Sequence, residues 1–247
     1  MILAANWKAY VEDTKKAKAL AATVKRLALK SPHTFIIAPS SAHLALFAKA
    51  GKKNFQFAAQ DMSVAAGGAA TGETTAVQLK NLGVAYAIIG HSERRAMGET
   101  DAEVSGKVVQ ALAQKITPIL CIGERVRDAD ATYLQGLRLQ LSSVLSAVAP
   151  NERGSLVIAY EPVWAIGRSA REALSPGDLA EMVLYIRKVL AEHLPARAAA
   201  KVPVLYGGSV EPGNIRDLAE GGRVDGFLIG HASVDSATFS TLVKQVP

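Results

Sequence analysis

Short apolar runs recur along the chain, separated by longer stretches in which apolar residues repeat with the period of a helix. The runs are rich in β-branched residues and are apolar at almost every position. Such continuous runs are typical of strands that are buried on both faces of a parallel sheet. We therefore predict strands at Ile2–Ala5, Phe35–Ala38, Phe55–Ala59, Tyr86–Ile89, Pro118–Cys121, Val157–Tyr160, Val204–Tyr206 and Gly226–Ile229.

Helical periodicity fills the intervals between these strands. The segment Ser175-Pro176-Gly177-Asp178 predicts a helix start, because a capping serine precedes a proline in the first turn. The Ala-rich segment Ala196–Ala200 is predicted to be a loop or the end of a helix. The predicted helices are Asp13–Leu29, Ser41–Ala50, Thr75–Leu79, Thr100–Gln114, Ala131–Ala149, Pro176–His193, Pro212–Ala219 and Ser236–Lys244.

The regular alternation of strands and helices predicts a parallel α/β fold. Eight units in 247 residues give about thirty residues each, the size of a βα repeat. Eight units suit a closed (β/α)8 barrel better than an open doubly wound sheet. The Gly-x-Gly-x-x-Gly fingerprint of dinucleotide-binding sheets does not follow the first strand. No Pro/Ser-rich linker divides the chain, so we predict a single barrel domain over residues 1–247.

Composition narrows the class of protein further. Hydrophobic residues make up 49% of the chain and charged residues 20%, which is ordinary for a globular protein and argues against disorder. The lone Cys121 excludes a disulfide framework and a thiolate metal cluster. No apolar run reaches the roughly 18 residues of a membrane helix, and the first residues do not have the layout of a signal peptide. We therefore expect a soluble, cytoplasmic protein.

The net charge of +6 raises the alternative of a nucleic-acid-binding protein. The basic residues, however, are spread along predicted helices, as in Lys15-Lys16-Ala17-Lys18, Lys25-Arg26 and Arg187-Lys188. Such spacing is typical of solvated helix faces. A modest positive field also suits an anionic small substrate. Charge alone leaves both kinds of partner open.

Reactive residues follow several of the predicted strands, at the end where a (β/α)8 barrel forms its active site. These segments are Asn6-Trp7-Lys8 after the first strand, Gly90-His91-Ser92-Glu93-Arg94-Arg95 after the fourth, Tyr160-Glu161-Pro162-Val163-Trp164-Ala165-Ile166-Gly167 at the sixth, Gly207-Gly208-Ser209 after the seventh and Gly230-His231-Ala232-Ser233 after the eighth.

Glu161 is the clearest candidate for a catalytic group among them. It follows an apolar strand directly and lies beside Pro162 and Trp164, where loss of water raises the basicity of a carboxylate. Taken singly, Lys8 is equally well a surface cation, and His91 fits a structural histidine better than a catalytic one.

The glycine turns after the last two strands expose backbone N–H groups where barrels commonly bind phosphate. Singly, Gly207-Gly208 is only a turn, and Cys121 fits a buried small side chain better than a nucleophile. The set as a whole contains a carboxylate, an imidazole, a cation and a phosphate cradle. It lacks a paired nucleophile and the spacing of metal ligands. A base and an electrophile beside a bound phosphate suit proton transfer next to a carbonyl.

In order and spacing, these segments resemble the signatures of the triosephosphate isomerase family over essentially the whole chain. Thr71-Gly72-Glu73, Cys121-Ile122-Gly123-Glu124 and Val224-Asp225-Gly226-Phe227 are similar to further segments of that family. The resemblance implies a TIM barrel. It also implies interconversion of dihydroxyacetone phosphate and glyceraldehyde 3-phosphate without a cofactor or a metal.

The resemblance also implies a role for each candidate residue. Glu161 would move the proton between the two carbons, and neutral His91 would hydrogen-bond the carbonyl oxygen. Lys8 and Asn6 would bind the substrate and stabilise the enediolate. The phosphate would be held by Gly167, Ser209, Gly230 and the amide of His231, and Glu93 would be an accessory carboxylate near Lys8.

The polar loop Gln60–Glu73 follows the third predicted strand, and its composition alone fits a flexible surface loop. The resemblance implies instead that it enters a second subunit of a homodimer. Thr71 would then approach the partner's active site, and Glu73 would pair with Arg94. Ala70 replaces the aromatic residue usual in the family, which predicts a weaker interface.

Two further departures from the family pattern concern the phosphate end. His231 stands where a second consecutive glycine is usual, and it either adds a cation at low pH or points into solvent. Arg168-Ser169-Ala170 replaces the usual Thr-Gly-Lys of the lid, and the helix-prone stretch Ala170–Ala173 predicts an altered balance of open and closed states.

Three alternative functions stay open. The same machinery can isomerise another small ketose or aldose phosphate. A catalytically silent barrel that serves as a binding protein is a second alternative, although Glu161, His91 and Lys8 are all present. A nucleic-acid binder is the third, and it rests on the isoelectric point alone.

Overall fold

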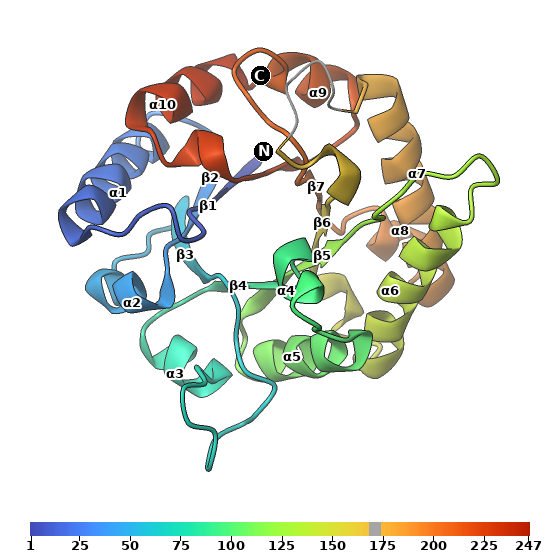
Figure 1. Cartoon of the computed structure of the whole chain (residues 1–247), viewed down its shortest axis with the longest axis horizontal. Helices are drawn as coiled ribbons and strands as arrows, with labels where there is room; N and C mark the ends of the chain where they lie inside the picture. The colour runs from blue at the N-terminus through green and yellow to red at the C-terminus, as the bar shows by residue number, and fades with distance from the viewer. Residues whose placement is uncertain (168–173) are drawn as a thin grey trace.

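Eight parallel strands close into a barrel in the computed structural model, which describes residues 1–167 and 174–247 (Figure 1). Each strand pairs with its neighbours in chain order, and the last strand pairs with the first. The fold is therefore the predicted (β/α)8 TIM barrel. The strands are β1 (Ile2–Asn6), β2 (Thr34–Ala38), β3 (Phe55–Ala59), β4 (Tyr86–Ile89), β5 (Thr117–Ile122), β6 (Val157–Tyr160), β7 (Val204–Tyr206) and β8 (Gly226–Ile229).

Helices surround this barrel as an outer ring (Figure 1). Ser175 caps α7 as predicted, since its hydroxyl accepts a hydrogen bond from the Asp178 amide and Pro176 opens the helix. The helices are α1 (Thr14–Ala28), α2 (Ser41–Leu44), α3 (Ala76–Asn81), α4 (Ser92–Ala96), α5 (Asp101–Ala113), α6 (Tyr133–Ala147), α7 (Pro176–His193), α8 (Ala196–Ala199), α9 (Ile215–Gly221) and α10 (Ser236–Gln245).

The prediction of one helix over Ser41–Ala50 was wrong in its second half. Helix α2 ends at Leu44, and a single 3-10 turn, Ala45–Phe47, follows it. Lys49 then takes a positive φ of 57°, and its amide donates to the carbonyl of Leu82 at 2.8 Å. This hydrogen bond to a neighbouring unit replaces the bond that a longer helix would have made.

Two apolar layers explain why the strands are apolar at nearly every position. Alternate side chains of β2 lie in different layers, with Ile36 inside the barrel and Phe35 and Ile37 between the sheet and the helices. The inner layer also contains Cys121, which is fully buried among small and branched side chains, as predicted. The strand ends can therefore carry polar groups only at the two rims of the barrel.

The barrel closes where β8 meets β1, and a glycine is needed there. Gly226 pairs with Ile2, and a Cβ atom at this position would lie 1.9 Å from the carbonyl oxygen of Ile2. Any side chain at position 226 would therefore push the two strands apart.

None of the helices in the described residues is both long and apolar enough to cross a membrane.

Candidate active site

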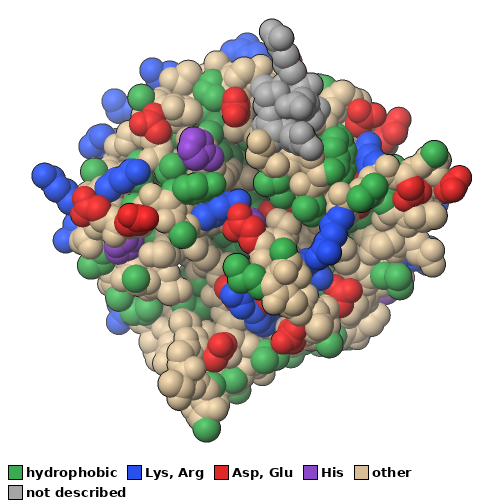
Figure 2. Space-filling view, viewed as in Figure 1, with side chains coloured by type: hydrophobic (Ala, Val, Ile, Leu, Met, Phe, Trp, Pro, Cys, Tyr) green, Lys and Arg blue, Asp and Glu red, His purple; other side chains and the backbone are tan. Residues whose placement is uncertain are grey.

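A cavity of about 260 Å³ opens at the ends of the strands where the sequence analysis placed the site. Figure 2 shows basic, acidic and histidine side chains gathered near the centre of the face seen in Figure 1. Eight of the predicted site residues line this cavity: Asn6, Lys8, His91, Glu161, Gly167, Ser209, Gly230 and His231. Glu93 lies beside it, in contact with Lys8, whereas Thr71 is exposed on the loop before α3.

His91 is fixed by the start of helix α4. It is the N-cap residue of that helix, and its Nδ1 accepts a hydrogen bond from the Glu93 amide at 3.2 Å. The imidazole is buried, with 6% of its surface exposed. Since Nδ1 is the acceptor, we assign the proton of the neutral ring to Nε2, which lies 3.1 Å from Oε1 of Glu161.

Glu161 follows the last residue of β6 and is 2% exposed. Its Oε2 accepts a hydrogen bond from the Ser92 amide at 3.0 Å, and its Oε1 faces His91. Both carboxylate oxygens therefore have a donor. Gly207 leaves room for the side chain, because a Cβ atom there would lie 2.8 Å from Cγ of Glu161.

Lys8 lies in a strained backbone conformation at the end of β1. Its φ of 46° is unusual for a residue with a side chain. Two hydrogen bonds hold this conformation: the Lys8 amide donates to Oδ1 of Asn6 at 3.0 Å, and Nε2 of Gln60 donates to the Lys8 carbonyl at 2.9 Å. The ammonium group pairs with Oε1 of Glu93 at 2.6 Å. The cation is thereby held at the wall of the cavity.

Glycine-rich backbone lines another part of the cavity. Gly167, Ser209 and Gly230 line it, and Gly167 has a φ of 72°, which favours glycine. Gly230 lies close to Lys8, since a Cβ atom at position 230 would be 3.9 Å from Nζ of Lys8. The His231 side chain is exposed and packs edge-on against Tyr10, with the ring centroids 5.4 Å apart. Glycine-rich backbone beside a lysine is a suitable site for an anion.

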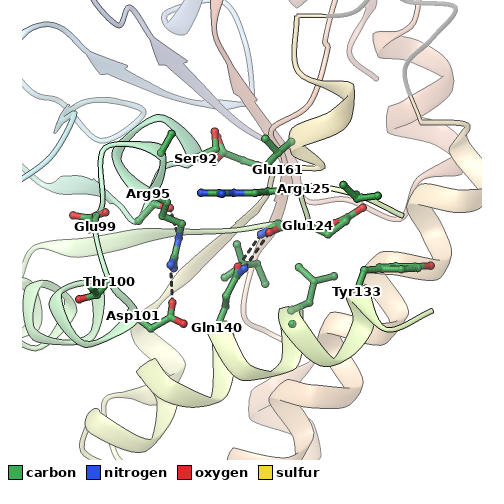
Figure 3. A pocket seen from close by; sticks show the side chains of 18 of the residues that line it. Ser92, Arg95, Glu99, Thr100, Asp101, Glu124, Arg125, Tyr133, Gln140 and Glu161 are labelled. Carbon is green, nitrogen blue, oxygen red and sulfur yellow. Dashed lines mark hydrogen bonds and ion pairs between the residues drawn. The ribbon is translucent and has the colours of Figure 1, made fainter. Parts of the chain in front are cut away.

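A larger cavity of about 540 Å³ lies next to this one, between β5, α5 and α6 (Figure 3). Glu161 borders both cavities. In the larger one, Arg95 pairs with Asp101 at 2.6 Å, and Gln140 is hydrogen-bonded to Gly123 (Figure 3). Lys8, His91 and the glycine turns do not line it. We therefore take the smaller cavity as the candidate active site.

Metal ligands and the thiol of Cys121 bear on the chemistry that is open to this site. Within residues 1–167 and 174–247, no three His, Cys, Asp or Glu side chains form a group that could hold a metal ion. Burial, together with the nearby Glu161 carboxylate, raises the pKa of the Cys121 thiol well above its ordinary value. This thiol therefore stays protonated, as an inert buried group.

Comparison with known proteins decides the family. A family model described as triosephosphate isomerase matches residues 1–246. This chain belongs to that family. Triosephosphate isomerases from three bacteria are similar to it over nearly their whole length. The protein from Thermus thermophilus is 40% identical, with 99% of this chain and 98% of the relative covered. The proteins from Symbiobacterium thermophilum and Moorella thermoacetica are 39% and 36% identical and cover 98% of this chain.

Sequence reasoning missed several groups that hold the site of this triosephosphate isomerase family member together. The Ser92 amide and the Gln60 side chain bind Glu161 and Lys8 from other loops. Arg127 lies near Trp164 although 37 positions separate them in the chain. No local pattern identifies such contacts, because they depend on how separate loops pack. The lid departure at Arg168-Ser169-Ala170, with the stretch Ala170–Ala173, lies outside the described residues.

Proposed function

We propose that this chain interconverts dihydroxyacetone phosphate and D-glyceraldehyde 3-phosphate, as the family name indicates. The observation that supports this most directly is the 3.1 Å contact between His91 Nε2 and Glu161 Oε1, in a cavity that glycine-rich backbone also lines. A base, a hydrogen-bond donor and an anion site are the parts that proton transfer beside a phosphate ester requires. The isomerisation moves protons within one molecule, so it needs no cofactor.

In the proposed mechanism, the Glu161 carboxylate removes a proton from the carbon next to the carbonyl. The product is an enediolate, and Glu161 then returns the proton to the neighbouring carbon. Because His91 and the Ser92 amide hold both carboxylate oxygens here, Glu161 must release at least one of these donors to reach the substrate.

His91 acts in this mechanism as a neutral donor. Its Nδ1 accepts a hydrogen bond from the Glu93 amide at the start of α4, so Nε2 is the ring nitrogen left to donate. In triosephosphate isomerases, a neutral histidine at a helix N-terminus polarises the carbonyl of the substrate. Nε2–H would donate to the carbonyl oxygen and help to move the proton between the two oxygens of the enediolate.

Lys8 and Asn6 supply the electrostatic stabilisation. Fixed charge in a cavity shielded from water stabilises an oxyanion far more than the same charge in water. Asn6 is buried, with 4% exposed, and the Lys8 side chain is mostly shielded from solvent. Glu93 is the accessory group, because its salt bridge fixes the Lys8 ammonium.

The phosphate of the substrate would bind to backbone N–H groups of Gly167, Ser209, Gly230 and His231. All four residues line the cavity, and glycine-rich backbone can approach an anion closely. Lys8 lies near enough to Gly230 to balance the phosphate charge.

The proposed active form is a homodimer joined through the loop Gln60–Glu73, with the cytoplasm as its place of action. Asp61 at the base of this loop pairs with Lys107 at 2.8 Å and with Arg94 at 2.9 Å, while Thr71 near the tip is exposed. An anchored loop with an exposed tip suits insertion into a second subunit. In this role Thr71 would reach the partner's cavity.

A coupled assay with glyceraldehyde 3-phosphate tests the function. We expect rapid conversion by the wild-type chain and a loss of about 10³-fold or more in Glu161→Gln, because the base is removed while the shape is kept. The variant also controls for isomerase carried over from the expression host. Turnover of a four-carbon ketose phosphate in preference to the triose phosphate would favour the alternative substrate, and no turnover of either would contradict the proposal.

A further inference from the structure

Arg127 holds an unusual position next to the site. It comes from the loop after β5, and its guanidinium carbon lies 5.3 Å from the ring centroid of Tyr133 and 5.4 Å from that of Trp164. Each distance falls within the range of a cation–π contact. Arg127 does not line the substrate cavity; instead it borders a shallow surface hollow together with Arg125, Val126 and Trp164. Its contribution to the reaction must therefore be indirect.

The partner of Arg127 is a buried carboxylate. The Glu124 side chain is 3% exposed, and its Oε1 accepts hydrogen bonds from three donors. These are the Tyr160 hydroxyl at 2.8 Å, Nε1 of Trp164 at 2.9 Å and Nε of Arg127 at 3.2 Å. Burial raises the pKa of Tyr160 above its ordinary value of 10, so this phenol remains a neutral donor. Arg127 supplies the only full positive charge among the three, and a buried carboxylate is costly without one.

The same stretch of chain holds the backbone on both sides of the proposed base. The Glu161 amide donates to the carbonyl of Ile122 at 2.8 Å, and the Val163 amide donates to the carbonyl of Glu124 at 2.9 Å. Gly123, between these two acceptors, packs so closely that a Cβ atom there would lie 1.7 Å from the Glu161 carbonyl oxygen. Any shift of the Glu124 segment therefore shifts Glu161.

We propose that Arg127 is a positioning residue for Glu161. It neutralises Glu124 and stacks on Trp164, and thereby fixes the 3-10 turn Val163–Ala165 that follows the base. This inference rests on the proposed function for its kinetic consequence only. The geometry itself requires no substrate.

The kinetic test compares Arg127→Met with Arg138→Met. Arg138 is a matched control, since it pairs with Glu192 at 2.8 Å on the surface, with its side chain 55% exposed. We expect Arg127→Met to lower kcat about tenfold or more and to leave KM within about twofold, because a base misplaced by about 1 Å can lose ~10²-fold in rate. Arg127→Lys, which keeps the charge, should recover part of kcat, and Arg138→Met should match the wild type.

A spectroscopic readout separates positioning from a loss of stability and from the function itself. The chain has two tryptophans, so the Trp164→Phe variant identifies the emission of Trp164. We expect Arg127→Met to make Trp164 more accessible to acrylamide quenching, without substrate and well below the melting temperature. If the wild type does not turn over triose phosphate, the proposed function is contradicted. The quenching of Trp164 would even then test the contact between Arg127 and Trp164.

Two results would overturn the proposal. One is a kcat of Arg127→Met equal to that of Arg138→Met, with unchanged quenching. The other is a loss expressed in KM, which would indicate a substrate-binding role. If Arg127→Met does not fold, Arg127→Gln is compared with Arg138→Gln instead. A lowered kcat with unchanged KM in Arg127→Gln supports positioning, and a wild-type kcat refutes it.

Discussion

The surroundings of Glu161 fix the position of its carboxylate, since Gly207 packs on its Cγ and two donors bind its oxygens. Glu161→Asp withdraws the carboxylate by one methylene. We expect kcat to fall about 10²-fold with little change in KM, because the base no longer reaches its proton at hydrogen-bond distance. Steady-state kinetics in both directions measure this, and turnover equal to that of the wild type would remove Glu161 from the mechanism.

At His231, either the side chain or only the backbone amide binds the substrate phosphate. The ring is exposed and packs against Tyr10, so we expect the amide to be the functional group. We expect KM of His231→Gly, measured between about pH 5.5 and 8.5, to follow the wild-type profile and to stay within about fivefold of it. An exposed charge interacts only weakly with a bound anion, so its removal changes KM little. A wild-type KM that rises with pH relative to that of the variant would instead assign a cationic role to the ring.

His33 gives the free energy of unfolding a pH dependence that is unrelated to catalysis. Burial, aided by the N-terminal ammonium group, lowers the pKa of His33 below its ordinary value of 6.5. As the pH falls below 6.5, the unfolded chain binds a proton that the folded protein does not, so stability declines until the lower, folded-state pKa is passed. Denaturant unfolding at several pH values should show this decline, and His33→Gln should reduce its slope. Equal slopes would contradict the assignment.

At this scale, the sequence predicts which residues meet but not what holds them. Asn6, Lys8, His91 and Glu161 all follow strands, and parallel strands of a closed barrel end on one rim, so their proximity could be predicted. The partners of these residues could not be found in the same way. The Glu93 amide that binds His91 belongs to a short helix, and hydrogen bonds of this kind appear only once the loops have packed.

Among the elements, α5 carries a complete capping box. Thr100 Oγ1 accepts from the Glu103 amide at 3.2 Å, and Glu103 Oε2 accepts from the Thr100 amide at 2.8 Å. Thr100→Ala should lower the free energy of unfolding by about 1 kcal/mol, which is roughly 2–4 °C in Tm for a chain of this size. Thr241→Ala, in the exposed middle of α10, is the control and should not lower Tm. Equal values of Tm for both variants would show that the cap adds nothing.

The predicted elements differ from the observed ones where packing outweighs the local pattern. All eight strands begin and end within one residue of the prediction, because a fully buried strand is apolar along its whole length. Helix α4, at Ser92–Ala96, was missed, since five residues with three charges carry no apolar period. The Ala-rich patch forms the short helix α8, close to the predicted loop or helix end.

At the scale of the whole molecule, the loop before α3 projects from the barrel (Figure 1). We expect sedimentation to give a homodimer at micromolar concentration. A variant that lacks residues 67–70 should have a higher dimer dissociation constant than the wild type. The reason is that the exposed tip of the loop, if it binds a pocket of the partner, contributes directly to the interface. A fully active monomer at every concentration would exclude the dimer. Arg94 already pairs with Asp61 of its own chain, so a contact with the partner's Glu73 would have to compete for it.

The closure of the barrel by Gly226 and Ile2 has a consequence for how the protein is made. Until the ribosome has added residues 226–229, one side of β1 has no neighbour and exposes a row of unpaired amides and carbonyls. Such an edge is a template for pairing with other nascent chains. Seven strands can form their pairs in the order of synthesis, yet the barrel stays open until β8 has been made. The synthesis of β8 therefore removes the exposed edge of β1 and with it this risk of aggregation.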